Sequence, residues 1–547
     1  MKKITALVHN EFIKEFSKKS LLVILALVLA LAAAFPFLSS RSWGGGDDSE
    51  YLERQLSWNE ESIDTAKKTG DKSMLAYFEA ERDALLIQKE LGVTRYSDYR
   101  MDLINQYSAL LQSQKAVEMA SQGSLGGDSY LQLPPEAAGL DREGLKGLAG
   151  QMDAKVQRLL TVLRSGDPMQ VASYNLEAQQ VALQSDLNQQ KAAEAAAKAD
   201  PKDEFLAREA EAAKKTAEMQ RARVALYQYR VDHKIGYGED DYRSASLQQM
   251  EQNLSLQYEI PLDEQQFLSS QKGGQFAANM SYQQYLENLE KAAQESTEEN
   301  QVLQYGLDNG VPPLYQSQKD PRTAAMNILN LGMLVSIVAV ILGGSSIARE
   351  FSSGSIRLLL TRPVRRWKVY LGKYLTMVLV SAGLYLAMFL AMVLSSGLQL
   401  GFGGFASPVL AFAGGRVVSY NFWAYCLPRM AYAFIGILFT GSLAFCLSAL
   451  TRNTAVSVAL PIAANMGYSL VFQLCLALRL YFVRFTPVPY MDMGGLMGPN
   501  AAYQNKMLLQ NYGFQLDPLY GGIMMMAFVA LFYLLGLWAF AKRDVTN

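Results

Sequence analysis

Cysteine and histidine are both scarce in this chain of 547 residues. The three cysteines, Cys426, Cys446 and Cys475, all lie in apolar runs, and the two histidines, His9 and His233, lie in distant segments of different character. A disulfide framework, a zinc site of cysteine and histidine, and a catalytic triad around a histidine each need more of these residues, placed closer together. The sequence therefore argues against all three kinds of site.

A phosphate-binding loop is also missing. The sequence G-x-x-x-x-G-K-[ST] does not occur, and the nearest glycine cluster, residues 144–150, lacks the Lys-Ser or Lys-Thr ending that holds phosphate and magnesium. We therefore expect no catalytic residue, no metal site and no cofactor in this chain, and we do not expect it to be an enzyme. Any nucleotide hydrolysis on which it depends would take place in another chain.

Charge is unevenly distributed along the sequence. The 50 Lys and Arg and 51 Asp and Glu give a net charge of −1, but residues 41–326 carry −15, whereas residues 1–20 carry +3 and residues 327–547 carry +11. Near-neutrality is thus a cancellation between an acidic middle and two basic, apolar ends. This pattern disfavours a single soluble globule, and nucleic acid is not an expected partner.

Six runs are long and apolar enough to cross a bilayer, whose core of about 30 Å needs roughly 20 residues of helix. None of them contains Asp or Glu, which argues against a carrier that moves protons through carboxylates within the membrane. The predicted spans are residues 21–39, 326–347, 374–400, 427–450, 454–481 and 521–541.

Basic residues in the short connections predict the orientation of these spans. They cluster before the first span and between the second and the third, so both segments and both termini should be cytoplasmic. The count of six crossings then places residues 40–325, about 401–425 and 482–520 outside, and residues 542–547 in a cytoplasmic tail. Membrane lipid is accordingly an expected partner.

The first span could instead be a signal peptide, because a basic flank precedes it and small residues, Ala32 to Ala34, lie near its end. A retained helix fits better, since residues 1–20 are themselves patterned as an amphipathic helix that would lie along the inner membrane surface. A solvated basic tail is the alternative. The apolar residues that recur at three- and four-residue intervals are Ile4, Leu7, Val8, Phe12 and Phe16.

Residues 40–325 are rich in Ala, Gln, Glu, Lys and Leu and predict a helical, partly coiled-coil domain. Asp167-Pro168 and Asp200-Pro201 mark helix starts, and Gly and Pro clusters divide the domain into several helices. The triplets Asp98-Tyr99-Arg100 and Asp241-Tyr242-Arg243 each follow an Ala-Lys-Lys-Thr sequence by about thirty residues. A duplicated helical hairpin would explain this echo, and so would chance similarity.

The connection between the second and third spans, residues 348–373, is too apolar to be only a linker. Ser355 can cap a short helix with one apolar face, and Pro363 would end that helix before a basic cluster. Such a helix suits docking into a groove on a cytoplasmic partner. The arginines could instead only anchor the loop to anionic lipid and fix the topology, and the residues alone leave both interpretations open.

A longer motif surrounds this connection. It consists of Glu350-Phe351, Gly354, Ile356-Arg357, residues 358–363 (LLLTRP), Arg366 and residues 371–374 (LGKY). In this motif the chain resembles the ABC-2 type permeases, the membrane subunits of ATP-binding-cassette exporters. The opening segment, residues 10–20, and the layout of six spans with a large domain after the first support the resemblance. Members of that family often have Thr where Ser355 stands, and many have little outside the membrane.

The resemblance implies a coupling helix around residues 353–362, seated on a cytoplasmic ATPase subunit that binds ATP and magnesium. It also implies an interfacial elbow at residues 1–20 and a dimer with a second copy of the chain or with a homologous permease. Together with the cysteine-free outer domain, it favours the cell membrane of a Gram-positive bacterium. The residues implied in ATPase coupling are Glu350, Phe351, Gly354, Ser355, Ile356, Arg357, Leu359, Leu360, Arg362, Pro363 and Arg366.

Three arginines near the outer ends of the spans, Arg429, Arg479 and Arg484, are candidates for a substrate exit. Each could meet an anionic group as it leaves, although anchoring at the membrane interface explains them equally well. Residues 482–520 are interrupted by Pro and Gly. They resemble the partly re-entrant external hairpin of this family, which could gate such an exit, and a simple interfacial loop is the alternative.

We therefore expect an all-α integral membrane protein with six spans and a large helical outer domain. The leading function is the permease of an ABC transporter that couples ATP hydrolysis by a separate subunit to export or extraction of an amphipathic, peptidic or lipid-like substrate. The alternative is an ATP-driven mechanical or sensory membrane protein, whose outer domain acts on cell-wall enzymes or detects an antibiotic.

Overall fold

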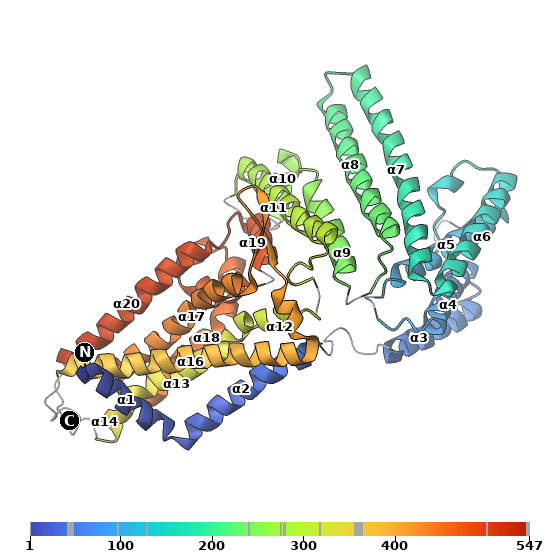
Figure 1. Ribbon diagram of the computed structural model, residues 1–547. Helices are drawn as coiled ribbons and strands as arrows, with labels where there is room; N and C mark the ends of the chain where they lie inside the picture. The colour runs from blue at the N-terminus through green and yellow to red at the C-terminus, as the bar shows by residue number, and fades with distance from the viewer. Residues whose placement is uncertain are drawn as a thin grey trace. The chain divides into compact units, whose positions relative to one another are not determined.

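Six helices among the described residues are long and apolar enough to cross a membrane, and the chain is an all-α membrane protein, as its sequence predicts. The computed structural model describes the chain with short gaps, and Figure 1 shows its helices. The described residues are 2–40, 49–95, 98–126, 129–238, 241–273, 276, 280–316, 319–354, 365–498 and 501–542.

The spans form part of one compact unit, which comprises Met1–Arg41 and Gln248–Asn547. In the second span a long α13 follows α12 and leads into a short α14. The helices at and near the membrane are α1 (Lys2–Phe16), α2 (Lys19–Ser40), α12 (Pro321–Met326), α13 (Ile328–Ser346), α14 (Ala348–Ser352), α16 (Arg366–Leu400), α17 (Phe422–Thr451), α18 (Thr454–Ala477) and α20 (Pro518–Lys542).

Several bounds of the spans differ from those expected from the sequence, and two of the differences involve charged residues. The third span begins as α16 at Arg366, eight residues before the predicted start, because Val369 and Tyr370 are buried and continue the apolar face between basic residues. The fifth span ends with α18 at Ala477 rather than at residue 481, and Arg479 follows with a φ of +58°. Charged side chains thus lie within or directly beside helices at both ends of the bundle.

The connections on the far side of the bundle from α14 contain several short elements. A two-stranded antiparallel hairpin, not predicted from the sequence, pairs Val409 with Tyr420, and residues 481–497 form three short 3-10 helices, as their Pro and Gly content suggests. The elements are η2 (Phe402–Ala406), β1 (Val409–Ala413), β2 (Arg416–Tyr420), η3 (Tyr481–Phe485), η4 (Val488–Tyr490), η5 (Gly495–Met497) and α19 (Ala501–Tyr512).

Close packing of α13 depends on glycine. A Cβ atom at Gly343 would lie 2.8 Å from the backbone oxygen of Gly441 on α17 and 2.8 Å from the sulfur of Met377 on α16. Small residues allow helix backbones to approach in this way, and any larger side chain would push the helices apart. Gly343 therefore holds three spans together at one point.

Gly343→Ala should lower the free energy of unfolding by about 1–3 kcal/mol, because the new methyl group overpacks this contact. Gly383→Ala in α16 is the matched control, since a Cβ there would meet no atom within 4 Å among the described residues. Denaturation in SDS, followed by circular dichroism, would compare them. Equal stability of the two variants would contradict the contact.

The insert after the first span is divided between two compact units, although the sequence suggests a single domain. The second unit is Ser42–Leu247, and the boundary falls within α9. α7 and α8 form its long helical hairpin (Figure 1), in which the Gln220 side-chain amide donates to the Gln179 side chain at 2.7 Å. The helices of the unit are α3 (Ser49–Thr69), α4 (Lys72–Glu90), α5 (Met101–Ser121), η1 (Pro135–Ala137), α6 (Arg142–Ser165), α7 (Pro168–Ala199), α8 (Glu204–Asp232) and the start of α9 (Tyr242–Gln257).

One of the two predicted helix starts in this unit is correct. Asp167 caps α7 by accepting the Met169 N–H at 2.8 Å. The start predicted at Asp200-Pro201 is wrong by three residues, because Asp203 is the residue that caps α8 and Pro201 lies in the turn before it. Two aspartates so close together compete for the cap, and the sequence alone does not rank them.

The final part of the insert belongs to the unit that contains the spans. There α11 lies on α19: the Asn288 amide donates to the Leu509 oxygen at 3.2 Å, and Lys506, itself 7% exposed, pairs with Glu299 at 3.0 Å. This part consists of the end of α9, α10 (Glu264–Lys272) and α11 (Tyr282–Asn309).

An Asp-x-Arg lock, in which an aspartate accepts the backbone N–H and the guanidinium of the arginine two residues later, precedes α5, α9 and α12. Partial burial of the Asp98 side chain by itself would raise its pKa. The hydrogen bonds from Arg100 and its positive charge together outweigh this effect, so the pKa of Asp98 lies below its usual value. A lowered pKa stabilises the fold at neutral pH, and this contribution is lost as the pH falls through that pKa. The locks are Asp98–Arg100, Asp241–Arg243 and Asp320–Arg322.

Two of these locks are the triplets of the sequence echo. The Ala-Lys-Lys-Thr sequences before them occupy different positions, however: the first ends α3 at Thr69, whereas the second, residues 213–216, lies inside α8. The shared feature is therefore a local way to begin a helix, and the structure does not favour a duplicated hairpin.

Candidate functional site

The described residues of the coupling motif lie at the end of the bundle where α13 leads into α14. α14 is fixed there by α17: the Ser448 hydroxyl accepts the backbone N–H groups of Ile347 at 3.2 Å and Ala348 at 2.8 Å. Ser448, Ile347 and Ala348 are all buried. The start of α14 is thus bonded to a neighbouring span and not only to its own helix.

Four charged side chains meet beside α14, and we call Glu11, Lys14, Glu350 and Lys373 the charge cluster. The Lys373 ammonium lies 2.9 Å from Glu11 Oε2 and 3.1 Å from Glu350 Oε1, and Lys14 also pairs with Glu350. The side chains of Lys373 and Glu350 are 2% and 5% exposed. Buried charges are costly unless each finds an opposite partner, and here two cations balance two anions.

The charge cluster joins three parts of the chain. Glu11 and Lys14 come from α1, Glu350 from α14, and Lys373 from the first turns of α16. A Cβ at Gly372 would lie 3.2 Å from Leu7 Cβ, so α1 also packs closely on α16. A displacement of α14 would therefore also displace α1 and α16.

The predicted elbow segment is helical, as α1. Four of its five expected apolar residues are half-buried, whereas Phe16 is 40% exposed and stacks on Phe12 at 5.8 Å. Ile13, which the sequence pattern does not include in that face, is 57% exposed. The half-buried residues are Ile4, Leu7, Val8 and Phe12.

Other motif residues surround α14. The Arg452 guanidinium lies 4.4 Å from the centre of the Phe351 ring, and Arg366 Nη1 donates to the Ala541 oxygen at the end of α20 at 3.3 Å. Gly354 ends this segment with a φ of +69°. The remaining predicted coupling residues, Ser355, Ile356, Arg357, Leu359, Leu360, Arg362 and Pro363, lie outside the described residues.

The candidate exit arginines have separate surroundings. Arg429 lies over the Tyr425 ring, 3.4 Å from its centre, and Arg484 lies 4.6 Å from the centre of the Phe485 ring. Arg479 is exposed just beyond α18. Both guanidinium groups thus make cation–π contacts, and the substrate exit at these arginines stays a prediction beside the anchoring alternative.

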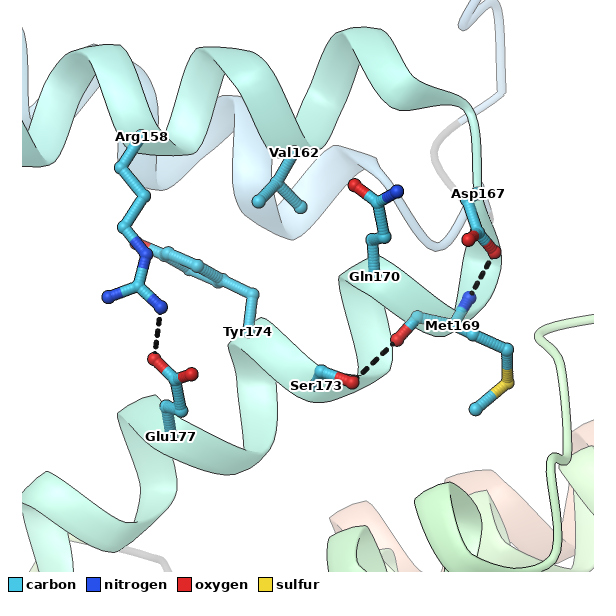
Figure 2. Close-up of a pocket in the computed structure, with 8 residues that line it drawn as sticks. All are labelled: Arg158, Val162, Asp167, Met169, Gln170, Ser173, Tyr174 and Glu177. Atoms are coloured by element: carbon cyan, nitrogen blue, oxygen red, sulfur yellow. Dashed lines mark hydrogen bonds and ion pairs between the residues drawn. The ribbon is translucent and has the colours of Figure 1, made fainter.

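A surface pocket of about 320 Å³ lies between α6 and α7 in the other unit, and Figure 2 shows its lining. Arg158 points at Glu177 and pairs with it, Asp167 caps α7, and the Ser173 hydroxyl donates to the Met169 oxygen at 2.9 Å. These polar groups are occupied by one another, so the pocket offers little to a ligand.

Sequence reasoning missed Ser448 as part of the site. It included Glu11, Lys14 and Lys373 only within segments that carry the family resemblance, and it used the two lysines to predict orientation. It also missed Arg322, which is 1% exposed and donates to the backbone oxygens of Ser407 at 3.1 Å and Pro312 at 2.7 Å. One signal was available for the cluster: Glu350 is among only four acidic residues after residue 327. A lone acid at the end of a span needs a basic partner.

The chain is similar to known proteins along most of its length. A family model described as "ABC-2 family transporter protein" matches residues 5–545. Two proteins of Bacillus subtilis (strain 168) are similar: "Uncharacterized protein YhcI", 29% identical over 24% of this chain and 42% of its own length, and "Uncharacterized membrane protein YdbK", 26% identical over 40% of this chain and 80% of its own length. The match thus spans less than half of the first relative. No solved structure matches the chain.

Proposed function

The chain belongs to the ABC-2 family of transporter proteins and is a transmembrane permease of an ABC transporter, and we propose that it couples ATP hydrolysis in a separate subunit to export or extraction of an amphipathic, peptidic or lipid-like substrate. The observation that carries this proposal is the charge cluster, which ties Glu350 at the start of the coupling motif to α1 and α16.

The coupling step is mechanical. The ATPase subunit, which binds ATP and magnesium, would contact the connection that begins at Gly354 and displace it as it closes. Because α14 is bonded to Ser448 and to the charge cluster, the displacement would move α13, α16, α17 and α1 together rather than bend one loop. Rigid packed elements carry such a shift over a distance.

Charge supports a cytoplasmic position for this end of the bundle. Basic residues at membrane-proximal ends favour the cytoplasmic side, and the acidic insert would then lie outside the cell membrane. The basic residues near this end are Lys14, Lys18, Lys19, Arg349, Arg365, Arg366, Lys368, Lys373, Arg452 and Lys542.

A second permease, identical or homologous, would complete the transporter. α18 and α20 expose large apolar side chains, such as Leu470 at 73% and Ile523 at 65%, which need lipid or another permease against them. The exposed apolar surfaces of α18 and α20 could thus contact the two expected partners in the membrane, which are lipid and a second permease.

Gly354→Pro should abolish ATPase coupling, because proline fixes φ near −65° and removes the N–H that Gly354 donates to the Phe351 oxygen at 3.2 Å. Co-purification in mild detergent should recover the ATPase subunit with the wild-type chain and lose it, or lose transport-linked ATP hydrolysis, with the proline variant. If no ATPase follows the wild-type chain, the proposal is wrong.

Gly354→Asn is the matched control. A Cβ at this position would meet no described atom within 4 Å, and asparagine tolerates a positive φ better than other residues with a side chain. This variant should keep most of the coupling. Equal behaviour of the proline and asparagine variants would show that the turn at Gly354 does not position the coupling segment.

A further inference from the structure

The segment between α18 and α19 enters the bundle instead of remaining at its surface. A Cβ at Gly436, midway along α17, would lie 2.8 Å from the Met491 oxygen, and one at Gly494 would lie 2.0 Å from the Leu329 oxygen on α13. Glycine is required for such close approach. The contacts place Asp492, between these positions, within the bundle, at the level of Gly436 in α17 and of the first turn of α13.

Two adjoining cavities flank this segment and share Tyr468 and Asp492. The smaller, of about 90 Å³, lies between α13, α17 and α18, and the larger, of about 360 Å³, lies between α18 and α19. A volume of that size with a mostly apolar wall suits a small amphipathic molecule. The apolar residues of the larger cavity include Phe472, Leu476, Pro489, Leu496, Met507 and Leu508.

Asp492 is the one charged residue among the described residues that line either cavity. Its carboxylate accepts the Gly495 N–H at 2.9 Å and the Tyr468 hydroxyl at 3.4 Å, and no basic side chain of the described chain pairs with it. Two hydrogen bonds leave acceptor positions of the carboxylate free. Within a membrane protein, an anion without a countercharge is a site for a cation.

Asn465 on α18 is a second, independent indication of a ligand. It lines the smaller cavity and is 5% exposed, and its Nδ2 has no hydrogen-bond partner in the described part of the protein. A buried amide is normally satisfied, so an unpaired one in a cavity wall indicates a polar group that binds there. Rotation of the amide would present either its N–H or its oxygen to that group.

We propose that these two cavities form the recognition site for a cationic amphipathic molecule. The ammonium or guanidinium group binds Asp492 next to Tyr468 and Asn465, and the apolar part occupies the larger cavity. This inference rests on the proposed function, because it names the class of substrate that the permease moves.

The site is also connected to the coupling end. Leu329, Gly332, Met333 and Ser336 of α13 line the smaller cavity, and the same helix ends at Ser346, immediately before α14 and Glu350. From Ser336 to Ser346 the rise is roughly 15 Å of continuous helix. A ligand that shifts α13 would therefore shift the position of Glu350 within the charge cluster.

The test is equilibrium binding of radiolabelled decyltrimethylammonium to the full-length permease in neutral phosphatidylcholine nanodiscs, with decanol as the uncharged competitor. Asp492→Asn keeps an acceptor for the Gly495 N–H and should weaken binding of the cation by about 10-fold or more, while decanol binding stays unchanged. Ser469→Trp, which adds a large side chain to the wall of the larger cavity, should weaken binding of both. Asp517→Asn removes the same charge from an exposed position outside the cavities and should have no effect.

The proposal is wrong if Asp492→Asn binds the cation as tightly as the wild-type chain does. It is also wrong if the wild-type chain binds the cation and decanol with equal affinity. Because the permease is measured without its ATPase, failure here leaves the coupling proposal standing. Conversely, failure to co-purify an ATPase would contradict the proposed function without changing the binding result.

Discussion

Lys373→Met is expected to lower the free energy of unfolding by about 3–5 kcal/mol, because it removes a cation from the buried Glu350 carboxylate and from the part-buried Glu11 carboxylate. Lys373 is the centre of the charge cluster, 2.9 Å from Glu11 and 3.1 Å from Glu350, and its side chain is 2% exposed. The same change should release α14 from α16 and so reduce transport-linked ATP hydrolysis. SDS denaturation followed by circular dichroism measures the first effect, and ATPase assays of the purified complex measure the second.

Two further variants separate this effect from a general loss of charge. Lys542→Met removes a lysine from an exposed position at the same end of the bundle and should change stability little. Lys373→Met combined with Glu11→Gln restores the charge balance and should recover about 0.5–3 kcal/mol relative to the sum of the single changes. Strict additivity would show that Glu11 and Lys373 do not interact.

The spans and α1 could be predicted from the sequence because each is a local property. A span needs only its own apolar residues, and the face of α1 needs only the spacing of residues such as Leu7 and Phe12. The charge cluster could not be predicted as a unit, since Glu11 and Lys373 are 362 residues apart and each is an ordinary charged residue in its own segment. Only the folded bundle brings them together.

The position of Asp492 within the bundle could not be predicted from the sequence, for a related reason. Hydropathy assigns residues 482–520 to the outside because the segment is short of apolar periodicity. The family resemblance indicates a partly re-entrant hairpin, but it does not say which residues enter the bundle. The contacts of Gly436 and Gly494 that carry it into the bundle are tertiary. The apolar runs predicted from the sequence contain no acid, but in the structure the second span ends with α14, which contains the buried Glu350, and Asp492 lies within the bundle.

Arg322 illustrates how burial decides the importance of a motif that occurs three times. Asp320–Arg322, Asp98–Arg100 and Asp241–Arg243 have the same local geometry, and in the sequence all three are ordinary helix starts. The Arg322 side chain is 1% exposed, however, and its guanidinium also holds Ser407 and Pro312 to α12, whereas the Arg243 side chain is 44% exposed.

Arg322→Met should therefore destabilise the protein by about 3–5 kcal/mol, since it leaves the Asp320 carboxylate buried without a cation and removes the donor to the backbone oxygens of Pro312, Ser407 and Pro408. Arg243→Met breaks the same lock where water can replace the arginine, and it should cost no more than about 1 kcal/mol. Recovery of monodisperse protein in size-exclusion chromatography after graded heating would compare the two. Equal resistance of the two variants to heating would contradict the claim that burial makes the Arg322 lock contribute more to stability than the exposed Arg243 lock.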